Sequence, residues 1–343
     1  MSGRRKVLVA GAGVLGLTTA LALADAGLEV AVHDPAPPGD NASGVAAGML
    51  APAFEAALDP LARLHFDLLT AARDLWPALA ERAGIVLDRT AALAVGDAAW
   101  LEEAAERVRS LGAGVRAVDR AGLEAAAPGL AAAVRHGFAV EGDWRLDAPA
   151  ALAALRRAGE AAGVAFHQAA VDGAAGFDLL VVATGAGRML IGLAPELARL
   201  TPIKGHILRG PGALGAVLRS SGAYAVPAAG GLLVGASMEP GRDDRRVDSG
   251  QVGRLRAAAA RLFPLLAEAP MTAAVGVRAA TADGLPLVGP SAAPGVLIAA
   301  GARRNGWLLA PLVAQAVAAY AAGAEPGPFA ARLDPRRTLS SRG

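Results

Sequence analysis

The chain has 343 residues, no cysteine and a formal net charge of only +2 at pH 7. This length exceeds one typical hydrophobic core and predicts two closely joined domains, while the lack of cysteine excludes disulfides, thiolate metal sites and thioether-linked cofactors. The arginines are scattered and lack neighbouring aromatic residues, so we expect no nucleic-acid partner.

The first predicted elements are a strand over residues 6–10 and a helix over residues 14–26. Between them, Gly11, Gly13 and Gly16 stand at G-x-G-x-x-G spacing. The first glycine permits a tight turn, the second lets backbone approach a pyrophosphate, and the third lets the helix pack against the strand. This order predicts a dinucleotide whose pyrophosphate lies at the N-terminus of the helix.

A second predicted strand, residues 29–33, ends at Asp34. A carboxylate at this point accepts hydrogen bonds from an adenosine ribose and argues against the 2′-phosphate of NADP, although it does not separate FAD from NAD. The basic residues before this unit imitate an export signal, but cleavage would remove the phosphate-binding strand. The apolar stretch 307–322 is too short to span a membrane comfortably. We therefore expect a cytoplasmic protein without a membrane segment.

The middle of the chain alternates between predicted helices and strands. We expect helical periodicity over 51–83, a strand pair over 86–95, a helix over 98–111, a strand over 132–140, a helix over 149–162, and strands over 164–166 and 177–183. Arg245 and Arg246 stand beside two aspartates and are typical of a solvated loop. The last residues, from 331, are expected to form a flexible tail.

The segment 178–187 is a buried strand that ends in Ala-Thr-Gly, with Thr184 and Gly185 at its end. Many flavoproteins place such a strand beneath FAD, although a core strand followed by a glycine turn has the same pattern. Together with the first glycine motif it favours FAD over NAD. No second G-x-G-x-x-G occurs, so we expect the substrate itself to reduce the flavin.

Several further segments occur in a characteristic order, at residues 46–52, 202–205, 224–227, 234–238, 276–286 and 304–306. With the N-terminal unit, they make residues 6–322 resemble the glycine oxidases of the D-amino-acid oxidase superfamily. The resemblance implies an α/β chain that combines a Rossmann-like FAD-binding domain, built on a parallel sheet, with an inserted antiparallel-sheet substrate domain. The FAD-binding domain would comprise residues 1–82, 141–200 and 286–330, and the substrate domain residues 83–140 and 201–285.

The resemblance also implies an activity. Its members hold FAD without a covalent link and oxidise glycine, sarcosine or small D-amino acids to the imine and 2-oxo acid, while O2 becomes H2O2. In bacteria that make thiamine, the glycine imine supplies thiazole synthesis. The family commonly forms homo-oligomers, so we expect a tetramer or a dimer.

The resemblance assigns a set of cofactor contacts to this sequence. They are Val14 and Leu15 at the pyrophosphate, Asp34 and Pro35 at the ribose, Ala42 and Ser43, Ala47, Gly48 and Met49 beneath the isoalloxazine, Val171 at the adenine, and Ala302, Arg303, Arg304, Asn305, Gly306, Trp307 and Leu308 around the flavin ring. Ser43 is equally suited to a plain helix cap.

Four side chains are candidates for the substrate site. Arg278 is the candidate for the substrate carboxylate, because a planar guanidinium binds it through two charge-assisted hydrogen bonds. Tyr224 begins a predicted strand and offers a second donor, although strand tyrosines often only pack. Met238, at the end of the next predicted strand, would line the pocket. Arg304 would stabilise negative charge on the flavin or meet the substrate.

Some positions depart from the family pattern. His206 stands where a glutamine is usual, and Ala302 and Arg303 stand where a histidine commonly occurs. The five histidines have neither catalytic nor metal-ligand spacing, so no metal site is predicted. Two alternatives stay open: a flavin dehydrogenase that passes electrons to an acceptor other than oxygen, and an FAD-binding protein without catalytic activity.

Overall fold

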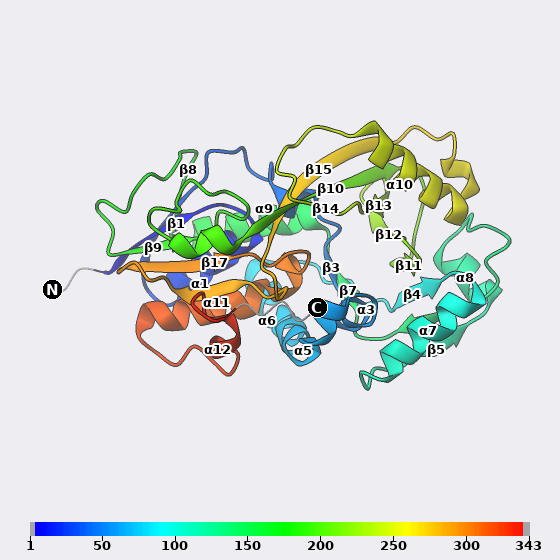
Figure 1. Cartoon of the computed structure of the whole chain (residues 1–343), viewed down its shortest axis with the longest axis horizontal. Helices are drawn as coiled ribbons and strands as arrows, with labels where there is room; N and C mark the ends of the chain where they lie inside the picture. The colour runs from blue at the N-terminus through cyan, green and yellow to red at the C-terminus, as the bar shows by residue number, and fades with distance from the viewer. Residues whose placement is uncertain (1–3, 339–343) are drawn as a thin grey trace.

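The computed structural model describes residues 4–338, and it begins with the βαβ unit that the glycine spacing predicts. Strand β1 (Lys6–Ala10) leads through the glycine turn into α1 (Val14–Asp25), and β2 (Glu29–His33) follows. The two strands are parallel, with Lys6 opposite Glu29 and Ala10 opposite His33. Figure 1 places this unit at one end of an elongated molecule.

The unit belongs to a six-stranded sheet of order β16-β17-β9-β1-β2-β8. Its other members are β8 (Ala165–His167), β9 (Leu179–Val182), β16 (Leu287–Pro290) and β17 (Val296–Ala300). Only the edge strand β16 runs antiparallel to its neighbour. The central strands are continuous apolar runs because both faces of the sheet are covered.

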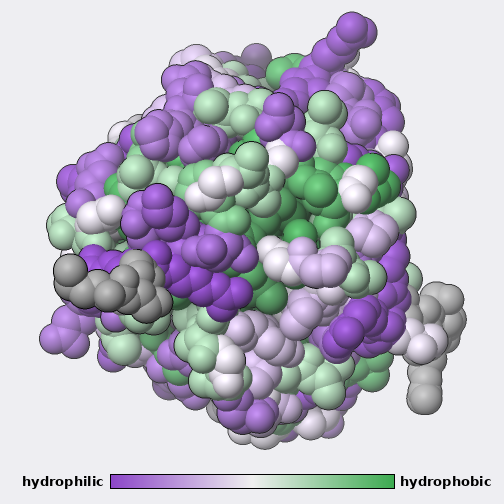
Figure 2. Space-filling view, turned by 90° about the vertical axis from the view of Figure 1, so that its left-hand side faces the viewer, coloured by the Kyte–Doolittle hydropathy of each residue, from purple (hydrophilic) through white to green (hydrophobic). Residues whose placement is uncertain are grey.

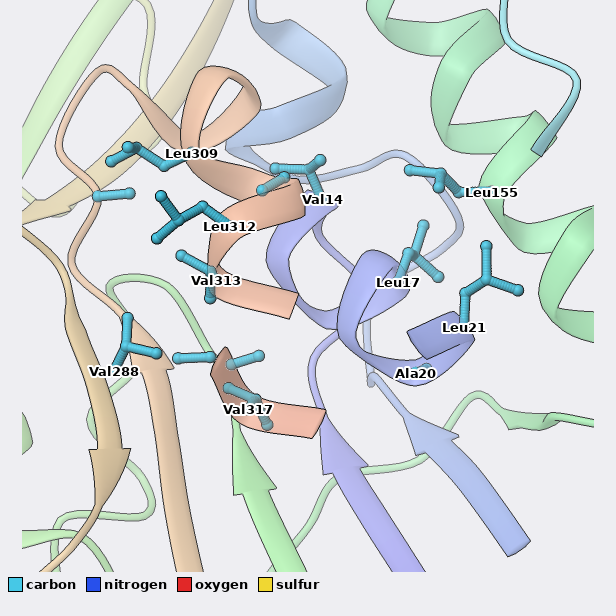
Figure 3. Packing of buried hydrophobic residues seen from close by; sticks show 14 of the residues in the cluster. Val14, Leu17, Ala20, Leu21, Leu155, Val288, Leu309, Leu312, Val313 and Val317 are labelled. Carbon is cyan, nitrogen blue, oxygen red and sulfur yellow. The ribbon is translucent and has the colours of Figure 1, made fainter. Parts of the chain in front are cut away.

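Helices α1 and α11 (Gly306–Ala322) lie side by side on one face of this sheet (Figure 3). Leu17 and Leu21 of α1 lie on the side toward Leu155 of α9 (Ala148–Ala161). Leu190 and Leu197, the latter in η1 (Pro195–Arg199), belong to the separate hydrophobic cluster that includes Leu180 and Val182. These apolar layers hold the sheet in place, and the candidate site lies at the carboxyl ends of its strands.

A second, nine-stranded sheet forms the other half of the molecule (Figure 1). Its strand order is β14-β10-β13-β12-β11-β4-β6-β5, and β15 pairs with β10. The strands are β4 (Ala92–Val95), β5 (Arg116–Val118), β6 (Gly137–Val140), β10 (Thr201–Gly210), β11 (Leu218–Ser220), β12 (Ala223–Ala228), β13 (Gly231–Gly235), β14 (Glu239–Pro240) and β15 (Thr272–Ala280). All pairs are antiparallel except β4 with β11.

Several helices accompany this second sheet. They are α7 (Ala98–Arg109), α8 (Arg120–Ala126), α10 (Ser249–Leu262) and η2 (Pro264–Leu266). The two-stranded ribbon of β3 (Met49–Leu50) and β7 (Trp144–Arg145) is separate from both large sheets. The fold class predicted from the sequence is confirmed: a parallel Rossmann-like sheet is combined with a largely antiparallel one.

The expected helical stretch at residues 51–83 is four helices preceded by the short α2 (Ala42–Val45). They are α3 (Pro52–Leu58), α4 (Pro60–Arg63), α5 (Phe66–Asp74) and α6 (Trp76–Ala83). Prolines stand in the first turns of α3, α4 and α6, where the missing N–H is not needed. Pro60 and Pro77 cannot continue the helix before them, whereas Leu64 and His65 separate α4 from α5.

Three predictions about local structure need correction. The expected strand pair at residues 86–95 is only β4, and Asp88 instead forms an isolated bridge with Arg145, whose Nε donates to its carboxylate at 2.9 Å. The strand expected from residue 132 starts at Gly137. Strand β13 ends at Gly235, so Met238 lies in the loop before β14 rather than at a strand end.

The C-terminal segment is held against the rest of the chain as far as residue 338, in contrast to the expected flexible tail. It contains α12 (Ala330–Leu333), and the Arg337 guanidinium donates to both carboxylate oxygens of Asp283, at 2.8 and 2.9 Å. Residues 339–343 of the expected tail lie outside the described residues.

The end of the molecule nearest β8 and β9 has hydrophobic residues toward its centre and hydrophilic residues around much of its rim (Figure 2). Among residues 4–338, no helix combines the length and the apolarity needed to cross a membrane.

Candidate active site

A cavity of about 430 Å³ opens at the carboxyl ends of β1, β2, β9 and β17 and reaches β15 of the second sheet. The residues that follow these strand ends, such as Gly11, Asp34, Thr184 and Ala302, line it. In open α/β sheets, ligands bind in the crevice beyond the carboxyl ends of the strands. The cavity is therefore where the sequence motifs would place a dinucleotide.

The glycine turn of this cavity leaves no room for side chains. Gly11 has φ +112°, and a Cβ there would lie 2.4 Å from the carbonyl oxygen of Ala183. A Cβ on Gly16 would lie 1.9 Å from the carbonyl oxygen of Gly11, so that the helix packs directly on the turn. Gly13 is the N-cap residue of α1 and has no side chain with which to cap it. The N-terminus of α1 therefore faces the cavity without a side chain at Gly11 or Gly13, which is the geometry that anion binding at a helix terminus requires.

Polar groups around the turn hold the neighbouring loops in place. The carboxylate of Asp34 accepts hydrogen bonds from the amides of Ala12, at 2.7 Å, and Ala36, at 2.9 Å. The Ser43 hydroxyl accepts one from the amide of Val14 at 3.0 Å, and Ser43 lies within α2, whose N-cap is Asn41. The indole of Trp307 donates to the carbonyl of Ser43 at 3.0 Å. These contacts bring α1, α2 and α11 to one wall.

Most of the predicted cofactor residues line this cavity. They are Gly11, Gly13, Val14, Leu15, Asp34, Pro35, Ala42, Ser43, Val171, Thr184, Gly185, Ala302, Arg303, Arg304, Gly306 and Trp307. The bare helix N-terminus, the carboxylate at the end of β2 and the apolar strand ends together fit FAD, with its pyrophosphate at α1. The adenosine half would extend toward Asp34 and Val171, and the flavin toward residues 302–307.

The other predicted cofactor residues do not line the cavity. Gly16 packs on the turn, and Ala47 lies in the hydrophobic core. Gly48 packs against Leu146, and a Cβ on Gly48 would lie 2.2 Å from the carbonyl oxygen of Leu146. Met49 belongs to β3. Asn305 and Leu308 are buried at the start of α11.

Arg278 on β15 enters the cavity wall without an acidic partner among residues 4–338. Its Nη1 lies 3.4 Å from the carbonyl oxygen of Ser237 and 3.8 Å from the sulfur of Met238. A Cβ on Gly205 would lie 2.2 Å from the same Nη1, so the glycine of the Lys-Gly-His segment provides the space for this guanidinium. Burial lowers the pKa of Arg278, which still leaves a guanidinium protonated at neutral pH.

Tyr224 on β12 and Met238 do not line the nucleotide cavity. The sulfur of Met238 lies beside Arg278, and the guanidinium carbon of Arg219 lies 5.9 Å from the ring centroid of Tyr224. A Cβ on Gly235, the cross-strand partner of Tyr224, would lie 2.1 Å from the phenol oxygen, so this glycine makes room for the tyrosine side chain. Burial raises the pKa of Tyr224, and the phenol therefore keeps the proton that it can donate. Met238 is 36% exposed.

Arg304 belongs to a charge cluster centred on the buried carboxylate of Glu55 in α3. Glu55 lies 2.8 Å from Nε of Arg304 and 2.5 Å from Nη2 of Arg219. Arg303, the one described non-glycine residue with positive φ (+51°), pairs with Asp59. Burial opposes the charge on Glu55, but Arg304 and Arg219 outweigh it and lower the pKa of Glu55. The other arginines of this region are thus paired, and Arg278 is not.

Asp143, a second buried acid, fixes the helix that carries Glu55. Its carboxylate accepts hydrogen bonds from the amides of Ala53, at 2.9 Å, and Phe54, at 2.8 Å, at the N-terminus of α3. Burial raises the pKa of Asp143 to about 6. The described residues hold no group of His, Cys, Asp or Glu suited to bind a metal ion.

The sequence analysis did not select several residues of this region, among them Glu55, Asp59 and Arg219. A signal for two of them is present, because Glu55 and Asp59 are isolated acids within an otherwise apolar helical segment. Such acids are rarely buried without a cationic partner. Nothing local indicates Arg219 as that partner.

Comparison with known proteins agrees with this geometry. A family model described as FAD dependent oxidoreductase (DAO) matches residues 6–320. The glycine oxidases of Geobacillus kaustophilus and Pseudomonas aeruginosa are 32% and 31% identical to this chain, covering 93% and 94% of it and 93% and 96% of their own lengths. The crystal structure of glycine oxidase from Geobacillus kaustophilus superposes with a TM-score of 0.81 at 29% identity, covering 98% of this chain and all of that one. The chain therefore belongs to the DAO family of FAD-dependent oxidoreductases and is an oxidoreductase that uses FAD.

Proposed function

We propose that the protein oxidises glycine and other small amines, such as sarcosine and small D-amino acids, to the imine, with O2 reduced to H2O2. The observation that carries the proposal is the Arg278 guanidinium, which lies in the cavity wall without an acidic partner among the described residues. A substrate carboxylate supplies that partner through two parallel hydrogen bonds. The names of the two relatives support glycine as the first candidate.

In this proposal the protein acts mainly by binding and orientation. Bound FAD would supply the hydride acceptor for the α-hydrogen of the substrate, and cavity residues such as Gly11, Asp34 and Trp307 would hold the cofactor. Arg278 holds the carboxylate, Tyr224 donates a second hydrogen bond to it, and Met238 limits the space for a side chain. The amine binds in its neutral form and loses a proton to solvent as the imine forms, and water then hydrolyses the imine to the 2-oxo acid and ammonia.

Within residues 4–338, no hydrogen bond joins a histidine to Arg278, and the ring of the nearby His206 is already bonded to Glu239 and to the amide of Asp248. His33 is the one histidine that lines the cavity within residues 4–338, and it belongs to the nucleotide end, after β2. A mechanism without a strong protein base therefore suits this site better than proton abstraction.

The electron acceptor and the pathway belong to the proposal as well. A dehydrogenase that passes electrons to an acceptor other than O2 would use the same binding residues. Supply of the glycine imine for thiazole synthesis rests on the resemblance to the glycine oxidases. The cytoplasmic location and the homo-oligomeric state expected from the sequence stay predictions.

The flavin spectrum of the yellow holoprotein tests the proposal. Under anaerobic conditions, glycine, sarcosine and D-alanine are added in turn, and air is then admitted. We expect bleaching by glycine or sarcosine, with recovery of colour and formation of peroxide in air. Bleaching without reoxidation would favour the dehydrogenase, and a flavin that none of the three bleaches would contradict the proposed substrates.

A further inference from the structure

The loop of residues 241–248, between β14 and α10, reaches the FAD cavity from the second sheet. Its Arg245 lines the cavity together with Asp40, and the two side chains form an ion pair. The sequence suggested an ordinary solvated loop for this arginine. The structure instead places Arg245, which comes from the half of the molecule built on the second sheet, at the nucleotide end of the cavity.

Buried side chains of β10 hold this loop in position. The ammonium group of Lys204, which is fully buried, donates to the carboxylate of Asp244 at 2.6 Å. Nε2 of the equally buried His206 accepts a hydrogen bond from the amide of Asp248 at 2.9 Å. Arg245 thus lies between two anchored residues, so the backbone directs it at the cavity.

The ion pair lies beside the turn that receives the pyrophosphate. Asp40 precedes Asn41, whose side-chain amide donates to the carbonyl oxygen of Ala12, within the glycine turn, at 3.4 Å. Asn41 also caps α2 through the amide of Ser43, at 3.0 Å, and the hydroxyl of Ser43 contacts the amide of Val14. The chain of contacts from Asp40 to the start of α1 is therefore short.

Among the arginines that line the cavity, Arg245 is the candidate for the pyrophosphate, because its ion pair is exposed and lies at the nucleotide end. Of the others, Arg303 and Arg304 pair with Asp59 and Glu55, and Arg278 lies on β15 at the end assigned to the substrate. Asp40, if unpaired, would repel the pyrophosphate. The helix terminus supplies only a partial positive charge.

We propose that Arg245 binds the pyrophosphate of FAD with N–H groups that Asp40 leaves free, and that it stays beside Asp40 and offsets the charge of that carboxylate. The side chains of Arg245 and Asp40 are 50% and 48% exposed, and ion pairs in water are weak. Phosphate is a suitable further partner for a guanidinium, because the planar group forms two parallel hydrogen bonds with it.

The test measures FAD binding, not turnover, because the proposal rests on the FAD dependence of the family and not on the proposed substrate. FAD release from the holoprotein is followed by the rise in flavin fluorescence, and the dissociation constant is determined at low and high salt. Arg245→Ala and the bulkier Arg245→Gln are compared with the matched control Arg246→Ala. Arg246 is exposed and lines a separate cavity of about 330 Å³ beside Lys204.

We expect both Arg245 variants to raise the dissociation constant about tenfold and to reduce its dependence on salt, since one charge-assisted contact is lost. Arg246→Ala should change it less than twofold. Equal behaviour of the Arg245 and Arg246 variants would overturn the proposal. The double variant Asp40→Asn with Arg245→Ala separates a direct phosphate contact from neutralisation of Asp40. FAD affinity that stays weak in this variant supports the direct contact. FAD affinity equal to that of the unmodified protein overturns the proposal, because Arg245 would then only neutralise Asp40.

Discussion

At the scale of single residues, the arginines of the site differ in whether they have an acidic partner. Among residues 4–338, Nη1 of Arg278 has only a carbonyl oxygen and a thioether as hydrogen-bond partners, and the absence of a side chain at Gly205 gives it space. Burial without an acidic partner lowers its pKa, so a bound anion stabilises its charged form. Arg278 is therefore the residue whose environment improves most when a carboxylate binds.

Arg278→Ala should raise KM for glycine by about tenfold to a hundredfold, because two charge-assisted hydrogen bonds are lost. The flavin absorption spectrum should not change. Arg209→Ala is the control, since Arg209 is an exposed arginine of the same sheet whose Nη1 contacts only the carbonyl of Ala229. Steady-state kinetics and the spectrum of each purified variant provide the comparison. Loss of FAD from the Arg278 variant would instead indicate a structural role.

The sequence predicts Arg278 but not the cluster around Glu55, and distance along the chain is the reason. Arg219 and Glu55 are 164 positions apart, and no spacing rule joins them. Arg245 shows the opposite limit. Its neighbours Asp243 and Asp244 are typical of a solvated loop, and only the anchors on Lys204 and His206 direct it to the cavity.

At the scale of elements, α3 depends on a residue far from it in sequence. Its N-cap Ala51 has no side chain that can accept a hydrogen bond, and Asp143, just before β7, accepts from two amides of its first turn instead. The positive end of the helix dipole also stabilises the negative charge of this carboxylate. Helix α3 carries Glu55, so the position of the charge cluster depends on this contact.

The raised pKa of Asp143 predicts a stability effect with a definite sign. Because its pKa is about 6 in the folded chain against 3.8 ordinarily, the folded state binds the proton more tightly, and stability is lost as pH rises through this window. The free energy of unfolding of the unmodified protein, minus that of Asp143→Asn, should fall by about 2 kcal/mol between pH 4 and pH 7. Denaturant unfolding at several pH values measures it. A difference that grows with pH would show that the two amide hydrogen bonds outweigh burial.

Local patterns predict the first βαβ unit because its strand, turn and helix are adjacent in sequence and each is specified by its own residues. The sequence predicts the helical content of residues 51–83, but Pro60 and Pro77 divide it, and the break between α4 and α5 has no proline. The prediction of a strand at residues 86–91 is wrong because Asp88 pairs with Arg145 of another segment. Tertiary partners of this kind leave no local signal.

At the scale of the whole molecule, the cofactor cavity is shared between the two sheets. Its wall combines Gly11 and Val14 of the first sheet's unit with Val277, Arg278 and Ala279 of β15. A ligand that contacts both halves stabilises their association, because it binds the folded state alone.

Scanning calorimetry of holoprotein and flavin-free protein should therefore show one cooperative transition for the holoprotein, at a melting temperature several degrees higher. Free FAD at a hundred times its dissociation constant contributes about 2.7 kcal/mol. Two separate transitions in the holoprotein, with only one of them shifted by FAD, would show that the halves unfold independently.

The indole of Trp307 lies in the cavity wall, and its ring centroid is 6.1 Å from that of Trp76, whose Nε1 donates to the carbonyl oxygen of Trp307 at 3.1 Å. Flavins absorb light in the range where tryptophan emits, so energy passes from this indole pair to a bound isoalloxazine. The chain thus contains an optical reporter of its own cofactor content, and the loss of FAD is visible as brighter ultraviolet-excited emission without any added label.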